Sequence, residues 1–198
     1  MRRWNKVDIL IAGVGGQGII LASRALASAA VKAGLPVRTA ETIGMAQREG
    51  SVVSYVRLGL AEGGPLIPLG SADVLLALEP AEACRNLKYL RPGGKALVST
   101  SPIIPVLAAL GSTPYPLEDI LTYLRRNVPA CYSFDALDLA VKAGSPRALN
   151  IVMLGALANL GLPFPAELLL NEALNLLPPR VHDINRRAFA LGRRALEV

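Results

Sequence analysis

Strand-like and helix-like stretches alternate through about residue 145 of this chain. The run at 72–79 is continuously apolar, as is typical of a central strand in a parallel sheet. Helices are predicted over 19–32 and from Pro80, and Asp135 is a candidate N-cap. Further strands are predicted at 7–12, 36–41, 51–59 and 95–101 and just before Asp135. This alternation predicts an α/β fold of three layers with a mainly parallel sheet.

From residue 147 onward the pattern is helical. The segment RALNIVMLGALANLGL is apolar nearly all round, which predicts a buried helix. The last helix is amphipathic, with an apolar face formed by Ile184, Ala188, Leu191 and Ala195 and a separate stripe of arginines. We therefore predict one domain over 1–198, with an α/β part over about 1–145 and a helical part over about 147–198.

A glycine-rich loop follows the first strand. Gly13, Gly15 and Gly18 satisfy G-x-G-x-x-G between a predicted strand and a predicted helix, which is a Rossmann-like arrangement. Such glycines let a ligand approach the backbone, and the helix N-terminus offers free N–H groups to an anion. Gln17 adds a possible amide donor. Glu41, near the end of the second strand, stands where a dinucleotide enzyme places its ribose-binding acid.

The stretch after Glu41 argues against a plain dinucleotide fold. TIGMAQREG is irregular, and such a segment near the carboxyl ends of parallel strands favours a binding site or an interface. The candidate contacts to a phosphate- or carboxylate-bearing ligand are Gly13, Gly15, Gly16, Gln17, Gly18, Gln47, Arg48 and Ser51. From the residues alone, a nicotinamide- or flavin-dependent oxidoreductase and a non-catalytic anion-binding module both remain open.

The composition and charge limit the classes of partner that the chain is expected to bind. The net charge is +6, yet aromatic residues make up only 5% and no nucleic-acid-binding motif is present. A basic surface for an acidic partner or ligand fits at least as well as a nucleic acid. The apolar segments fall short of the roughly 20 residues that span a bilayer. We therefore expect a cytoplasmic protein that binds neither nucleic acid nor membrane.

Metal-ligating and nucleophilic residues are scarce. Two cysteines, Cys84 and Cys131, and one histidine cannot build a structural zinc site or a cysteine-held iron–sulfur cluster, each of which needs about four ligands. We expect both cysteines to be buried free thiols and His182 to be a cap or surface residue. No catalytic residue and no metal ligand are predicted in this chain.

Five motifs occur in an order that resembles a known family. GVGGQGI, GMAQREGSVVSYVRLG, ADVLLALEPAEA, LRPGGKALVS and LNIVMLGALA together are similar to the gamma-type subunit of the 2-oxoacid:ferredoxin oxidoreductases. Within that family the resemblance is greatest to the small (beta) subunits of indolepyruvate ferredoxin oxidoreductases, and it covers nearly the whole chain. Glu49 stands where the family usually has glycine, and Tyr55 where histidine is common.

The resemblance implies a reaction and a set of partners. The reaction is the oxidative decarboxylation of an aryl 2-oxoacid with coenzyme A, which gives an aryl-acetyl-CoA, carbon dioxide and reduced ferredoxin. Thiamine diphosphate, Mg²⁺ and 4Fe–4S clusters belong to the large (alpha) subunit in this family. The chain has no Gly-Asp-Gly motif for thiamine diphosphate, so we expect it to bind no cofactor alone and to show little activity without its partner.

Overall fold

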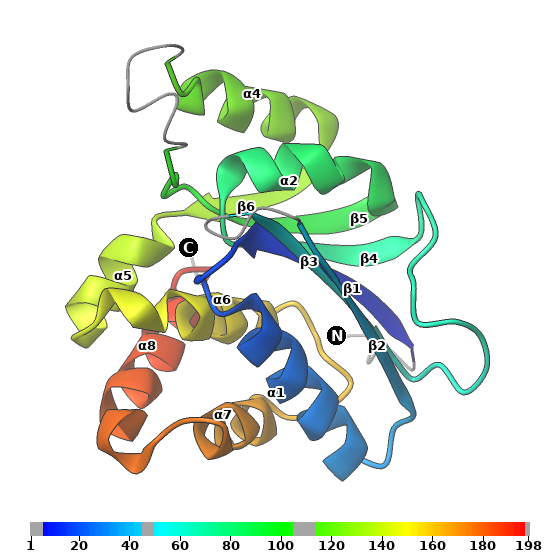
Figure 1. Cartoon of the computed structure of the whole chain (residues 1–198), viewed down its shortest axis with the longest axis vertical. Helices are drawn as coiled ribbons and strands as arrows, with labels where there is room; N and C mark the ends of the chain where they lie inside the picture. The colour runs from blue at the N-terminus through cyan, green and yellow to red at the C-terminus, as the bar shows by residue number, and fades with distance from the viewer. Residues whose placement is uncertain (1–5, 45–49, 105–113, 197–198) are drawn as a thin grey trace.

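A computed structural model describes residues 6–44, 50–104 and 114–196. Its centre is a six-stranded sheet in the order β2-β3-β1-β4-β5-β6 (Figure 1). The strands are β1 Val7–Val14, β2 Val37–Ile43, β3 Ser51–Leu58, β4 Ala72–Ala77, β5 Leu90–Ser99 and β6 Ala130–Phe134. All eight residues of β1 are buried, because this strand lies inside the sheet and is covered on both faces.

One strand runs against the others. β1, β4, β5 and β6 pair in parallel, whereas β3 pairs antiparallel with both β1 and β2. The prediction of a mainly parallel sheet is therefore confirmed. Because β3 is inserted between β1 and β2, the strand that follows α1 along the chain is not the spatial neighbour of β1.

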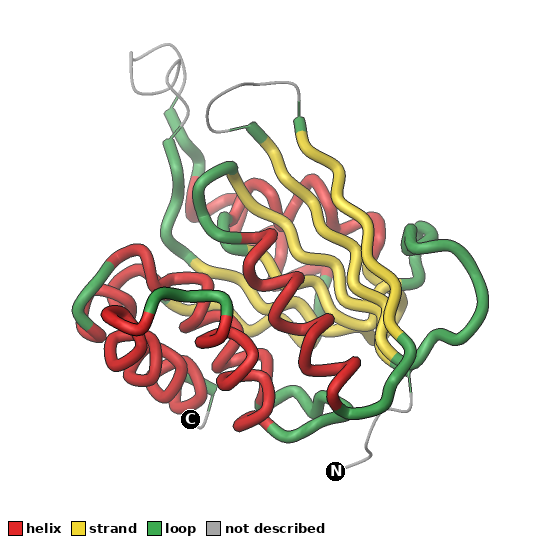
Figure 2. Tube along the Cα trace, turned by 60° about the horizontal axis from the view of Figure 1, so that its bottom comes forward, coloured by secondary structure: helices red, strands yellow, loops and turns green. Residues whose placement is uncertain are grey.

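Helices cover both faces of this sheet. α2 (Pro80–Asn86) and α4 (Leu117–Asn127) lie on one face, and the remaining helices lie on the other (Figures 1 and 2). The second group comprises α1 Ile19–Lys32, α5 Ala136–Ala143, α6 Leu149–Ala158, α7 Ala166–Asn175 and α8 His182–Arg194. Single 3-10 turns occur at η1 Leu87–Tyr89, η2 Pro146–Ala148 and η3 Pro179–Val181. The chain thus has the three layers predicted.

Local capping rules explain several helix boundaries. Pro80 occupies the first turn of α2, and the Glu79 side chain accepts a hydrogen bond from the Glu82 amide. Asp135 caps α5 in the same way by accepting from the Asp138 amide, and α5 ends at Gly144, whose φ is 116°. The predicted start of α2 and the predicted N-cap of α5 are both confirmed.

The backbones of α6 and α8 lie very close to each other. A Cβ at Gly192 would lie 1.9 Å from the Val152 carbonyl oxygen, and one at Gly155 would lie 2.2 Å from the Phe189 carbonyl oxygen. The two backbones therefore touch at glycines. The fully buried residues of α8 are Asn185, Ala188, Phe189 and Gly192, and Ile184 and Leu191 of the predicted apolar face are partly buried against the core. Glycine carries no hydrophobic signal, so the pattern predicted the apolar face but not the role of Gly192 in this contact.

The helices are too short or too polar to cross a bilayer over the part of the chain that the structure describes.

Candidate functional site

The glycine loop lies where the chain connections change sides. After β1 the chain turns to α1 on one face of the sheet, and after β4 it turns to α2 on the other (Figure 1). The carboxyl ends of β1 and β4, which are neighbours, therefore form a topological switch point. In open α/β sheets this is the place where ligands bind.

Glycine is required in this loop for more than one reason. Gly16 and Gly18 have φ of 95° and 80°, a left-handed backbone that side chains disfavour. A Cβ at Gly18 would also lie 2.3 Å from Nδ2 of Asn150, which donates to the Gly18 carbonyl. Gly16 faces open space, with nothing within 4 Å of its added Cβ. A ligand can therefore approach the loop at Gly16 but not at Gly18.

Gln17 bridges the two strands at the switch point. Its Oε1 accepts from the Val14 amide at 2.8 Å, and its Nε2 donates to the Leu78 carbonyl at 2.9 Å. A Cβ on Gly13 would lie 2.6 Å from the same Oε1. The Gln17 amide thus fixes the loop against the end of β4, and Gly13 leaves room for that side chain.

A cavity of about 240 Å³ opens beside this loop. It is lined by Gly16, Gln17, Ser101, Pro102, Ile103, Leu137, Pro146, Arg147 and Leu149. The lining comes from four places in the chain: the glycine loop, the segment after β5, the first turn of α5, and η2 with the start of α6. Its walls are mainly apolar with a few polar groups, as is usual for small-molecule sites.

Arg147 is the cation among the residues that line this cavity, and it was not among the predicted site residues. Its side chain is exposed and has no hydrogen bond or ion pair with any described residue. It precedes α6, where a positive charge is unfavourable because the helix N-terminus is already positive. Neither α1 nor α6 has an acidic residue in its first turn or a side-chain cap. Arg147 and the uncapped N-termini of α1 and α6 therefore give one side of the cavity positive charge, which suits an anionic ligand. An arginine directly before a buried helix was the one sequence signal that pointed to it.

A polar network supports the opposite wall. The buried Ser101 hydroxyl donates to Asp135 Oδ1 at 2.6 Å and accepts from the Leu137 amide at 3.3 Å. The Ser101 hydrogen bond lowers the pKa of the Asp135 carboxyl, with further help from the Asp138 and Leu137 amides and from Lys142. These bonds join the segment after β5 to the first turn of α5, so they hold two sides of the cavity together.

This network predicts a pH dependence of stability. A lowered folded pKa means that the ionised Asp135 stabilises the protein above its unfolded pKa of about 3.9, and that this contribution disappears as pH falls through the folded value. We expect Asp135→Ala to cost about 1 kcal/mol at pH 7 in urea unfolding, and less below about pH 4. Asp135→Asn, which keeps the capping oxygen, should cost less than Asp135→Ala at pH 7. An Asp135→Ala cost that did not change with pH would contradict the assignment.

Ser51 belongs to a different cluster on the α2 side. Its hydroxyl donates to Oε2 of the buried Glu82 at 2.7 Å, and Arg85 pairs with the other carboxylate oxygen. Nearby, the Tyr115 hydroxyl donates to Glu79 and accepts from the Ala81 amide. Burial raises the pKa of Tyr115, and the Glu79 carboxylate raises it further. This cluster anchors the first residue of β3 and the segment before α4 to the first turn of α2.

The predicted site residues are thus divided. Gly16 and Gln17 line the cavity, Gly13 and Gly18 shape the loop, and the Gly15 amide donates to the Gly50 carbonyl at 2.9 Å. Ser51 lies in the α2 cluster. Gln47 and Arg48 lie outside the described residues.

The dinucleotide interpretation of Glu41 was wrong. Glu41 lies on the edge strand β2, and the antiparallel strand β3 separates it from β1 and the glycine loop. A Rossmann enzyme places the ribose-binding acid on the strand next to the loop. In addition, the Gln17 side chain occupies the space between β1 and β4.

The remaining candidate residues have structural surroundings. Cys84 and Cys131 are half-buried free thiols, and burial raises the pKa of both. His182 begins α8, with Nε2 3.0 Å from the Leu177 carbonyl oxygen. Among the described residues, no group of three histidine, cysteine, aspartate or glutamate side chains is placed to hold a metal ion.

Comparison with known proteins gives one consistent family. Residues 8–195 match the model of the pyruvate ferredoxin/flavodoxin oxidoreductase family. The chain is 43% identical to "Indolepyruvate oxidoreductase subunit IorB" of Pyrococcus horikoshii over 95% of both chains. It is 41% identical to the subunit of the same name from Archaeoglobus fulgidus over 94% of both.

A solved structure has the same fold. The gamma subunit of a keto/oxoacid ferredoxin oxidoreductase from Geobacter sulfurreducens superposes with a TM-score of 0.71 and 27% identity. The match covers 97% of this chain and 99% of that one.

Proposed function

Because the chain belongs to the pyruvate ferredoxin/flavodoxin oxidoreductase family, we propose that it is the non-redox small subunit of an indolepyruvate:ferredoxin oxidoreductase. Its relatives are subunits of 2-oxoacid:ferredoxin oxidoreductases, which are enzyme complexes. The observation that carries the proposal is the 43% identity over 95% of both chains to an indolepyruvate oxidoreductase subunit. We further propose that the chain is one domain and that the complex works in the cytoplasm.

The proposed reaction converts an aryl 2-oxoacid and coenzyme A into an aryl-acetyl-CoA, carbon dioxide and reduced ferredoxin. The bond between the carboxylate and the keto carbon breaks, and a bond forms between that keto carbon and the coenzyme A sulfur. Two electrons go to ferredoxin, and the thiol proton is released. Thiamine diphosphate and iron–sulfur clusters supply the carbanion and electron-transfer chemistry. The residues of this chain do not fit either group, since it has two cysteines and no Gly-Asp-Gly. We therefore assign both to the large partner subunit.

The contribution of this chain is a binding site for an anion. The side of the cavity formed by Gly16 and Arg147 suits the phosphate-bearing part of coenzyme A. The apolar side chains of Pro102, Ile103 and Leu149 suit the less polar part of such a ligand. We propose that the cavity holds coenzyme A while the chemistry takes place on the large subunit.

Substrate preference tests the proposed function. The purified complex should reduce ferredoxin with indolepyruvate at a kcat/KM at least about tenfold above that with pyruvate, 2-oxoglutarate or a branched aliphatic 2-oxoacid, a difference of about 1.4 kcal/mol. Equal or greater activity with one of these other acids would reject the aryl substrate and leave the family membership intact.

Replacing Arg147 tests the cavity. In the assembled complex, Arg147→Ala should raise the KM for coenzyme A about tenfold or more, because a hydrogen bond to a charged group contributes about 1.5–3 kcal/mol. Arg180→Ala is a matched control, since Arg180 also follows a proline in a 3-10 turn and is exposed. The control should keep the wild-type KM. Equal KM values for coenzyme A in wild type and Arg147→Ala would show that the cavity is not the coenzyme A site.

A further inference from the structure

The loop between β3 and β4, residues 59–71, is apolar and exposed. It contains two prolines, three leucines and one isoleucine but only one charged residue, Glu62. Leu66 and Leu69 are 58% and 64% exposed, and Pro65 and Pro68 beside them are exposed as well. Single exposed leucines are ordinary on protein surfaces. Two on one short loop, flanked by exposed prolines, form an apolar patch of the kind that marks an interface.

The same loop is held firmly in place. Ile67 is buried against the core on the α2 face of the sheet. The Arg57 guanidinium donates to the Gly64 and Leu66 carbonyls at 3.1 and 3.2 Å, and Arg38 donates to the Ala61 carbonyl at 3.0 Å. The Gly70 amide donates to the Lys88 carbonyl at 2.9 Å. A loop tied at so many points does not need to be ordered when it binds.

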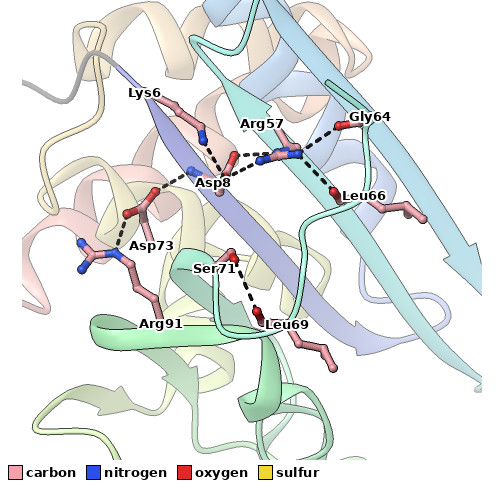
Figure 3. A network of polar contacts seen from close by, with 9 residues as sticks. All are labelled: Lys6, Asp8, Arg57, Gly64, Leu66, Leu69, Ser71, Asp73 and Arg91. Carbon is pink, nitrogen blue, oxygen red and sulfur yellow. Dashed lines mark hydrogen bonds and ion pairs between the residues drawn. The ribbon is translucent and has the colours of Figure 1, made fainter. Parts of the chain in front are cut away.

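A buried ion pair supports these contacts. Arg57 is itself fixed by Asp8, with Nε to Oδ1 and Nη2 to Oδ2 both at 2.9 Å. Figure 3 shows the Leu66 and Leu69 side chains extending from the loop away from this pair. The interior of the protein thus fixes the loop backbone while the leucines point outward.

Two exposed basic residues, Arg38 and Lys88, border the loop. The Arg38 side chain donates to the Ala61 carbonyl, and the Lys88 backbone carbonyl accepts from the Gly70 amide. Lys6 and Arg91 are paired with carboxylates, Lys6 with Asp8 at 3.5 Å and Arg91 with Asp73 at 2.7 Å. Lys6, Arg38 and Lys88 are exposed, whereas Asp8 is buried and Asp73 is partly buried. The loop therefore has an apolar centre and a basic rim formed by Arg38 and Lys88, opposed by the single carboxylate of Glu62. We call this surface the Leu66/Leu69 patch.

We propose that the Leu66/Leu69 patch docks onto the large subunit, in a shallow apolar pocket bordered by carboxylates. This inference rests on the proposed function, because it requires a large subunit. A basic rim is complementary to an acidic surface. A second copy of this chain does not fit, because a two-fold dimer through this patch would bring two identical basic rims together. The patch lies at the end of the sheet opposite the glycine loop, so docking there leaves the cavity open to its ligand.

Binding of the large subunit by matched variants tests the proposal. The double variant Leu66→Ser/Leu69→Ser should raise the dissociation constant for the purified large subunit of the same complex about tenfold or more. Val31→Ser is the control, because Val31 is 62% exposed on α1, outside the patch. Lys88→Glu should weaken binding about threefold or more, whereas Arg180→Glu in the turn η3, between α7 and α8, should change it by less than about twofold. All variants alter exposed side chains, so urea unfolding should match that of the wild type.

The binding results distinguish the docking surface from the proposed function. If the wild-type chain binds the large subunit tightly and Leu66→Ser/Leu69→Ser binds it within about twofold of that affinity, the proposed docking surface is wrong. The proposed function would not be affected by that result. Failure of the wild-type chain to bind the large subunit would overturn both. A third outcome is that the wild-type chain sediments with anionic phosphatidylglycerol vesicles, and that Leu66→Ser/Leu69→Ser loses this sedimentation but still binds the large subunit normally. This result would assign the patch to a membrane surface and overturn the proposal.

Discussion

Gly192→Ala should destabilise the protein by more than about 3 kcal/mol, beyond the usual range for overpacking. The new methyl group would lie 1.9 Å from the Val152 carbonyl oxygen and 2.8 Å from its carbon. Both atoms belong to the α6 backbone, so no side-chain rotation relieves the clash. α6 and α8 would have to separate and expose Ala188 and Phe189, which are buried between them and the core.

Displacement of α6 in Gly192→Ala should also disturb the candidate site. α6 carries Asn150, which contacts the glycine loop, and Leu149, which lines the cavity. Urea unfolding of Gly192→Ala, with Gly64→Ala as the control, measures the effect. A Cβ on Gly64 meets nothing within 4 Å, so that variant should unfold within about 0.5 kcal/mol of wild type. A Gly192→Ala protein as stable as the control would show that α6 and α8 do not pack as described.

Asp8→Ala should cost about 3–5 kcal/mol, because it leaves the Arg57 guanidinium buried without its counter-ion. Asp8 is 2% exposed and Arg57 is 8% exposed, so water cannot replace the lost carboxylate. The 59–71 loop should loosen too, since Arg57 is its main anchor. Unfolding in urea, together with hydrogen exchange of the loop amides, reports both effects.

The double variant Asp8→Leu/Arg57→Met distinguishes two contributions to the free energy of unfolding: the penalty for a buried charge without a partner and the net stabilisation by the ion pair. Replacing a buried ion pair by apolar residues is often neutral, so the double variant should be more stable than Asp8→Ala. Asp8→Ala within about 1 kcal/mol of wild type would instead place the pair in contact with water.

Local sequence rules predicted the elements of this fold well. The helix over 19–32 occurs with those bounds, because the glycine loop precedes its start and Gly34, with a φ of 74°, follows its end. Pro80 and Asp135 begin their helices through contacts within a few residues. The second strand runs over 37–43 rather than 36–41, and the antiparallel place of β3 was not predicted. Which strands become neighbours depends on tertiary packing, which periodicity does not encode.

The site was only partly predictable for the same reason. The glycine loop carries its own signal, because left-handed backbone at Gly16 and Gly18 needs glycine. Arg147 and Ser101 join it only through the fold, far along the chain, and no spacing rule connects them. Likewise, Gly155 and Gly192 are unremarkable in a helical pattern until α6 is placed against α8. Glu41 is the opposite case: its spacing from the glycine loop matches a dinucleotide site, but β3 separates it from that loop in the fold.

Stoichiometric reconstitution tests the central claim most directly. The separately purified chain is titrated into the purified large subunit, and ferredoxin reduction with indolepyruvate and coenzyme A is followed. Neither protein alone should support the reaction, and activity should rise with added chain to a plateau at a fixed molar ratio. The chain alone should contain no iron, thiamine diphosphate or flavin. Full activity of the large subunit alone, or ferredoxin reduction by this chain alone, would contradict its assignment as a required non-redox subunit.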